Sequence, residues 1–150
     1  VILLFFIMTE LRFKDIREGP YLLEYFLIYS QLTNAPVIPE EQFREIIRKL
    51  PENHHIFVCY LGDEVVGMFT VLIEQKLTNG GKCVAHVEDV VVDNQKRGIG
   101  IGKSMIQFAV GYAQGKNCYK IILNCREDLR EFYQKEGFAK HSEGMAIYFD

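Results

Sequence analysis

The sequence predicts a single domain of mixed α/β class, built on one central sheet with helices packed against it. The chain has 150 residues, of which 49% are hydrophobic and 25% charged, which is typical of a globular domain with one core. Its first extended segments follow one another, and its later ones alternate with helical patterns in the order β-α-β-α-β. No internal repeat or low-complexity linker divides the chain. The sheet is therefore expected to be mixed.

The N-terminal third predicts one strand and two helices. We interpret the short segment Leu11–Phe13 as the first strand. The apolar, aromatic stretch Tyr21–Leu32 follows Gly19-Pro20 and predicts a buried helix, since proline fits the start of a helix. A second helix, Pro39–Lys49, begins at one proline and ends before the next.

The middle of the chain predicts three strands. Ile56–Leu61 and Val65–Glu74 flank the turn residues Gly62-Asp63, which predicts a hairpin. Ala85–Val92 is rich in valine, the residue type that suits a strand buried on both faces. We expect this last strand to lie at the centre of the sheet.

The C-terminal part predicts two helices around a further strand. Apolar residues recur with helical spacing over Met105–Tyr112, and Gly115 is expected to close that helix. Ile121–Cys125 predicts a buried strand, and Asp128–Glu136 a short helix. The final segment, Phe138–Phe149, is expected to be extended.

The N-terminus carries an apolar run, Val1–Ile7, directly before Met8. A bilayer span takes about 20 residues, so this run is too short for one, and it lacks the basic region and cleavage site of a signal peptide. We interpret residues 1–7 as an apolar extension that packs against protein, for example in an oligomer. Residues 8–150 are then predicted to form one domain, with Met8 as the natural start.

Charge and cysteine content exclude several classes of function. The net charge is −3 and the sequence pI is about 5.8, which argues against nucleic acid or an anionic membrane as a partner. The four cysteines form no CxxC pair, and neither they nor the four histidines show the spacing of a metal site. We therefore expect an intracellular protein without a metal, cytoplasmic or in an organelle.

A glycine-rich turn, Arg97–Lys103, lies between the valine-rich strand and the helix that follows. Successive backbone N–H groups at the start of a helix can bind an anion, and glycine lets the backbone approach phosphate closely. The Walker A pattern fails because Arg97 stands where it needs glycine, and the GxGxxG fingerprint fails because the spacing is GxGxG. A tight turn without function is the remaining alternative at this point.

Arg97, Gly100 and Gly102 fill the pattern R-x-x-G-x-G, which resembles the acetyl-CoA pyrophosphate loop of the GNAT acetyltransferase superfamily. Other segments resemble, in order and spacing, the glucosamine 6-phosphate N-acetyltransferase family within it: Gln31–Phe43, Ile73–Lys76, His86–Val92, Asn117–Leu123 and Phe132–Phe138. The resemblance implies the GNAT acyl-CoA N-acyltransferase fold, a twisted, mostly antiparallel mixed sheet flanked by helices. It also implies acetyl-CoA as cosubstrate.

The resemblance assigns the binding of acetyl-CoA to one run of residues. It implies that the strand parts from its neighbour beyond Glu88, which frees main-chain N–H groups for the thioester and the pantetheine arm. The implied cofactor-binding residues are Val90, Val91, Val92, Arg97, Gly98, Ile99, Gly100, Ile101, Gly102, Lys103 and Tyr133. Tyr133 matches the tyrosine that donates a proton to the thiolate, and the alternative is a core tyrosine with a satisfied hydroxyl.

The resemblance also implies an acceptor site for glucosamine 6-phosphate, with Glu88 and Asp89 as catalytic residues beside Tyr133. Because they are adjacent on a strand, we expect their side chains on opposite faces of the sheet. The implied substrate-binding residues are Thr33, Lys76, Leu77, Thr78, Asn79, Glu88, Asp89, Val90, Tyr119, Lys120 and Asn124. A homodimer is implied, in which Tyr119 and Lys120 reach the sugar of the other subunit.

Three positions depart from the family pattern. Asn124 replaces an acidic residue that contacts substrate, Leu129 replaces an asparagine, and Tyr148 replaces a phosphate-binding arginine. These changes leave two alternatives open: an acetyltransferase for another amine, such as a polyamine, small metabolite or protein, and a non-catalytic module that binds acyl-CoA.

Overall fold

The computed structural model describes residues 1–149, except for the side chains of Leu4 and of residues 7–9. Asp150, the end of the predicted domain, lies outside the described residues, as do those side chains of the apolar run. The strands are β1 (Leu11–Asp15), β2 (His54–Leu61), β3 (Glu64–Gln75), β4 (Cys83–Val92) and β5 (Cys118–Leu123). The helices are α1 (Ile2–Glu10), α2 (Leu23–Tyr29), α3 (Glu40–Lys49), α4 (Ile101–Gly115) and α5 (Arg130–Lys135).

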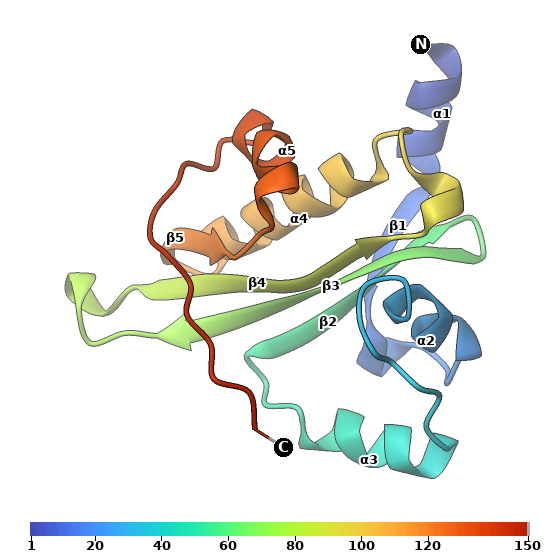
Figure 1. Cartoon of the computed structure of the whole chain (residues 1–150), viewed down its shortest axis with the longest axis horizontal. Coiled ribbons are helices and arrows are strands. Elements are labelled where there is room, and N and C mark those ends of the chain that lie inside the picture. Colours follow the sequence, from blue (N-terminus) through green and yellow to red (C-terminus); the bar gives the residue numbers. More distant parts are fainter. Residues whose placement is uncertain (150) are drawn as a thin grey trace.

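The five strands form one sheet in the order β1-β2-β3-β4-β5, as Figure 1 shows. Neighbouring strands are antiparallel up to β4, and only β4 and β5 run parallel. A parallel pair needs a crossover connection, and α4 supplies it. The predicted mixed sheet, mostly antiparallel and flanked by helices, is confirmed.

Helices cover the two faces of the sheet, and each face has its own core. On one face α4 and α5 pack over Phe69, Val71 and other fully buried side chains. On the other, α2 and α3 pack over Met68 and Val91. We call this second face the α2 face. Burying one such side chain fully contributes roughly 1.5–3 kcal/mol, so both layers stabilise the sheet.

The predicted elements are present, with changes at their ends, but the middle strand of the five is β3 and not the predicted Ala85–Val92 strand, β4. Helix α2 covers only Leu23–Tyr29 of the predicted Tyr21–Leu32. Strand β5 begins at Cys118 and ends at Leu123, three residues earlier at its start and two at its end than predicted. Its early start follows from Asn117, whose positive φ of 58° turns the chain, and whose carbonyl accepts the Cys83 N–H at 3.1 Å. The register therefore begins one residue after that turn.

The C-terminal segment Phe138–Phe149, predicted to be extended, forms no strand with any described part of the chain. Met145, Ile147, Tyr148 and Phe149 expose most of their side-chain surface. Strand β5 is the last strand of the sheet, so within the described residues its outer edge has no strand partner. The single chain therefore leaves both an apolar segment and a sheet edge open to another chain.

Helix α1 passes through Met8 and runs directly into β1. Val1, Ile2 and Leu3 are largely exposed in the single chain, so the packing expected for residues 1–7 in an oligomer stays a prediction. None of the described helices is long and apolar enough to cross a bilayer.

A cluster of polar side chains joins β1 and β2 to the C-terminal half of α4. His55 Nδ1 lies 2.8 Å from Asp15 Oδ2, and His55 Nε2 lies 2.9 Å from the Tyr112 hydroxyl. Arg17 forms an ion pair with Asp15 at 2.9 Å and donates to the carbonyls of Pro51 and His54. The cluster therefore ties the crossover helix to the edge of the sheet.

We expect Tyr112→Phe to lower the free energy of unfolding by about 1 kcal/mol, because it removes the hydroxyl that hydrogen-bonds to half-buried His55. Chemical denaturation of the two proteins measures this difference. An unchanged midpoint and slope would show that the bond contributes nothing.

Candidate active site

Strands β4 and β5 separate halfway along β4. Their parallel pairing runs from Cys83 opposite Cys118 to Val87 opposite Leu123 and stops there. Strand β4 continues to Val92, and its other side stays paired with β3. Backbone groups of residues 88–92 on the β5 side therefore have no strand partner, as the resemblance implies. This opening can form hydrogen bonds with an extended ligand.

A bulge in β4 reshapes the start of this opening. Asp89 has a positive φ of 51°, and the register with β3 shifts opposite it. Val87 and Val90 consequently both pack against the α4 side of the sheet, although they are three residues apart. The expectation that Glu88 and Asp89 follow strict alternation was therefore wrong, because the bulge adds one residue to the strand.

Glu88 and Asp89 are both exposed, and neither makes a hydrogen bond or ion pair with another described residue. Glu88 lies opposite Thr70 on the α2 face. Asp89 lies close enough to the Tyr29 hydroxyl for its charge to act there. The two carboxylates are thus available to a ligand on the α2 side of the opening.

The glycine-rich turn leads from the end of β4 into α4. Gly98 and Gly100 have φ values of 83° and 91°, a conformation that favours glycine, and Gly100 is the N-cap of α4. Arg97 Nε donates to the Val92 carbonyl at 3.2 Å, which fixes the turn against the strand. No acidic residue lies in the first turn of α4. The free N–H groups of residues 101–103 therefore form a site for an anion.

Gly102 has a different role from Gly98 and Gly100. A Cβ on Gly102 would lie 3.3 Å from the Phe132 ring and 3.6 Å from Val92. The missing side chain lets the start of α4 pack closely against both α5 and the end of β4. The turn and the helix that carries Tyr133 are therefore in direct contact.

Tyr133 lies in α5 and is only 7% exposed. Its ring packs edge-on against Phe132 and Phe138, with centroids 5.0 and 5.9 Å away. Burial raises the pKa of the Tyr133 hydroxyl, and Cys125 nearby raises it further. The hydroxyl makes no hydrogen bond within the described residues, so it is a protonated donor without a partner of its own.

Lys76, one of the predicted substrate residues, belongs to a polar cluster on the α2 face, whereas the predicted Val90 packs on the α4 side. Lys76 Nζ lies 2.6 Å from Glu74 Oε1, and His86 Nε2 lies 2.7 Å from Glu74 Oε2. Both hydrogen bonds lower the pKa of the Glu74 carboxyl, and the bond to Glu74 raises the pKa of Lys76. Sequence reasoning missed Glu74, although it stands only two residues before Lys76, at the end of β3.

Tyr29, at the end of α2, is a second residue that the sequence did not single out. Burial raises the pKa of its hydroxyl, and the charge of Asp89 adds to this effect. Its carbonyl accepts the N–H groups of Leu32 and Thr33 at 2.9 and 3.0 Å. Tyr29 thus links the loop of exposed Thr33 to the bulge of β4. The available signal was the polar hydroxyl of Tyr29 on an otherwise apolar helical segment.

The remaining predicted residues lie after β3 and at the two ends of β5. Leu77, Thr78 and Asn79 occupy the exposed turn after β3. Tyr119 and Lys120 follow Cys118 at the start of β5. The Lys120 Nζ lies 5.5 Å from the centre of the Tyr119 ring and 3.4 Å from His141 Nε2. Asn124 follows β5 and is exposed. Among the described residues, no group of histidine, cysteine and acidic side chains could hold a metal ion.

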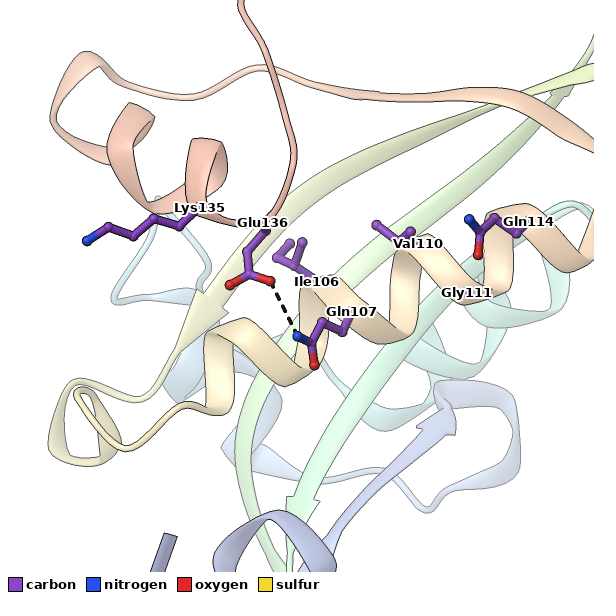
Figure 2. Close-up of a pocket in the computed structure, with 7 residues that line it drawn as sticks. All are labelled: Ile106, Gln107, Val110, Gly111, Gln114, Lys135 and Glu136. Carbon is purple, nitrogen blue, oxygen red and sulfur yellow. Dashed lines mark hydrogen bonds between the residues drawn. The ribbon is translucent and has the colours of Figure 1, made fainter. Parts of the chain in front are cut away.

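A groove of about 290 Å³ lies between α4 and α5 (Figure 2). Ile106, Val110 and Gly111 form its apolar part, and a hydrogen bond of 3.5 Å between Gln107 and Glu136 spans its end. None of the catalytic, cofactor-binding or substrate-binding residues predicted from the sequence lines this groove. It is therefore separate from the opening between β4 and β5.

A turn that can bind an anion, an opened pair of strands and a buried tyrosine fit an acyltransferase of the acetyl-CoA-dependent type. The Acetyltransferase (GNAT) family model matches residues 21–138, and the chain belongs to this family. Membership implies acetyl-CoA as the donor.

Within this family, the chain is similar over most of its length to proteins named for one acceptor. The chain is 36% identical to glucosamine 6-phosphate N-acetyltransferase 1 of Oryza sativa subsp. japonica, over 95% of this chain and 86% of that protein. It is 34% identical to the Arabidopsis thaliana glucosamine 6-phosphate N-acetyltransferase, over 97% of both. The crystal structure of an Arabidopsis thaliana glucosamine-6-phosphate N-acetyltransferase superposes with a TM-score of 0.80 at 29% identity, over 93% of this chain and 99% of that one.

Proposed function

We propose that this protein transfers the acetyl group of acetyl-CoA to the amine of D-glucosamine 6-phosphate, giving N-acetyl-D-glucosamine 6-phosphate and CoA, a step toward UDP-N-acetylglucosamine. The observation that carries the proposal is the opening of β4 beyond Val87, flanked by the glycine turn and by Tyr133. Full-length similarity to enzymes named for this acceptor supports the choice of amine.

Acetyl-CoA supplies the acetyl group as a thioester, and the residues around the opening fit it. Free N–H groups at residues 101–103 and the positive φ at Gly98 and Gly100 suit its pyrophosphate. The unpaired backbone of Val90, Val91 and Val92 suits the pantetheine arm and the thioester oxygen. Arg97, Ile99, Ile101 and Lys103 complete the proposed binding residues.

Two proton transfers accompany the attack of the amine. The side chains of Glu88 and Asp89 have no other partner among the described residues. They bind the ammonium group and take up its proton. Tyr133 gives its hydroxyl proton to the leaving sulfur, since a phenol near pKa 10 and a thiol near 8.5 are close enough for transfer in a dry site. Its raised pKa keeps that proton in place until it is needed.

The acceptor lies along the α2 face in this proposal. Lys76 faces its phosphate, and Thr33, Leu77, Thr78, Asn79 and Asn124 border it. Residues 8–150 form the catalytic domain, and the intracellular setting predicted from the free cysteines is part of the same proposal.

The protein acts as a homodimer, with Tyr119 and Lys120 of each subunit reaching the sugar site of the other. Two observations support this. The apolar residues Met145, Ile147 and Phe149 are exposed at alternate positions, and the outer edge of β5 lacks a strand partner among the described residues. A second copy can satisfy both.

Product mass spectrometry with acetyl-CoA tests the function. Glucosamine 6-phosphate is expected to gain one acetyl group, and its kcat/KM should exceed that of glucosamine by about 100-fold, because the charged phosphate partners add roughly 3 kcal/mol. Preferred turnover of a polyamine or a protein would contradict the acceptor. Binding of acetyl-CoA with no product from any amine would show a non-catalytic module.

A further inference from the structure

The carboxylate of Glu74 joins two basic side chains on the α2 face. One oxygen lies 2.6 Å from Lys76 Nζ, and the other lies 2.7 Å from His86 Nε2. Glu74 therefore holds Lys76 and His86 next to each other, one on each of its oxygens.

Each basic side chain keeps a hydrogen-bonding position that Glu74 does not use. The ammonium group of Lys76 has three N–H donors, of which Glu74 takes one. His86 Nδ1 makes no hydrogen bond with another described residue, and the side chain is 29% exposed. A protonated imidazole donates from both nitrogens, so His86 can bind Glu74 and an anion at the same time.

The charge of His86 decides how strongly this part of the face attracts an anion. The single negative charge of Glu74 offsets the positive charge of Lys76, so this pair alone attracts an anion weakly. Lys120 lies on the same face, opposite Val84, while Glu88 lies two residues beyond His86. Tyr148, where the resembling family has a phosphate-binding arginine, is 94% exposed in the C-terminal segment. His86 is the basic side chain that Glu74 holds beside Lys76 on this face.

We propose that His86 is a second cationic ligand for the phosphate of the acceptor, held beside Lys76 by their shared carboxylate, Glu74. This inference rests on the proposed function, since it assigns one more residue to that acceptor. It gives His86 a role in specificity.

The test compares kcat/KM for glucosamine 6-phosphate with kcat/KM for glucosamine. In His86→Gln this ratio is expected to fall about tenfold, as a charge-assisted hydrogen bond to the phosphate is lost. The KM for acetyl-CoA should stay unchanged. An unchanged ratio in the variant, with the wild-type preference intact, would overturn the role of His86 alone.

The chain offers a matched control. His55 forms a similar pair with Asp15, at 2.8 Å, but lies in the polar cluster of β1, β2 and α4. His55→Gln should leave the ratio at its wild-type value even though it costs stability. His86→Arg should retain the preference, because the guanidinium is a good phosphate ligand. A loss in His86→Arg equal to that in His86→Gln would contradict a role for charge.

A second measurement uses the unmodified protein. Glucose 6-phosphate carries the phosphate but no amine, so it binds without reacting. Its addition should shift the ring resonances of His86 in NMR spectra and leave those of His55 in place. Binding with no shift at His86 would reject the proposal, whereas equal turnover of glucosamine and its phosphate by the wild type would instead reject the proposed acceptor.

Discussion

Replacing Tyr133 with phenylalanine is expected to lower kcat about 100-fold and to leave the affinity for acetyl-CoA within about twofold. General acid catalysis contributes roughly 10²- to 10⁴-fold, and the substitution removes only the proton donor. The ring keeps its contacts with Phe132 and Phe138. Steady-state kinetics and calorimetry with acetyl-CoA measure the two quantities.

The pH dependence of kcat separates this role from a structural one. Burial raises the pKa of Tyr133, so the hydroxyl stays protonated as the pH rises through the ordinary tyrosine value of about 10. The alkaline decline of kcat due to Tyr133 is therefore expected only above that value, and it should be absent from Tyr133→Phe. Unaltered kcat in the variant would remove Tyr133 from the mechanism.

Replacing Gly100 with alanine is expected to raise the dissociation constant of acetyl-CoA about tenfold and to lower the free energy of unfolding by about 1–2 kcal/mol. A left-handed conformation costs an ordinary residue roughly that much. Gly100 adopts φ 91° at the N-cap of α4, so relief of the strain would move the N–H groups that face the pyrophosphate. Calorimetry and chemical denaturation measure both effects.

Gly111→Ala is the matched control, because nothing lies within 4 Å of a Cβ at either position and Gly111 sits in the regular part of α4. This change should stabilise the protein by about 0.5–1 kcal/mol and leave acetyl-CoA binding unaltered. Equal effects of the two alanines would show that backbone conformation at Gly100 is unimportant.

Periodicity and turn residues predicted most of the fold. The hairpin of β2 and β3, the valine-rich β4 and the helix after the glycine turn depend on contacts close in sequence, and all are present. The start of β5 was placed three residues late, because its register with Cys83 is set by a long-range pair. No pattern of neighbouring residues in the sequence predicts such a pair.

The candidate site was predicted less completely than the fold. The opening of β4 came from the resemblance, whereas the bulge at Asp89 depends on how β3 pairs with β4 and leaves no composition signal. Glu74 was missed for a related reason. The hydrogen bond between Glu74 and His86 joins two strands. The sequence by itself shows only that Glu74 stands two residues before Lys76.

Helix α5 has six residues, far fewer than the roughly 12–15 that an isolated helix needs to persist in water. Phe132, which belongs to this helix, packs where Gly102 has no side chain. The helix that carries the proposed proton donor, Tyr133, therefore rests on the turn proposed to bind the pyrophosphate. Any larger side chain at position 102 would therefore disturb both the turn and the helix that carries Tyr133.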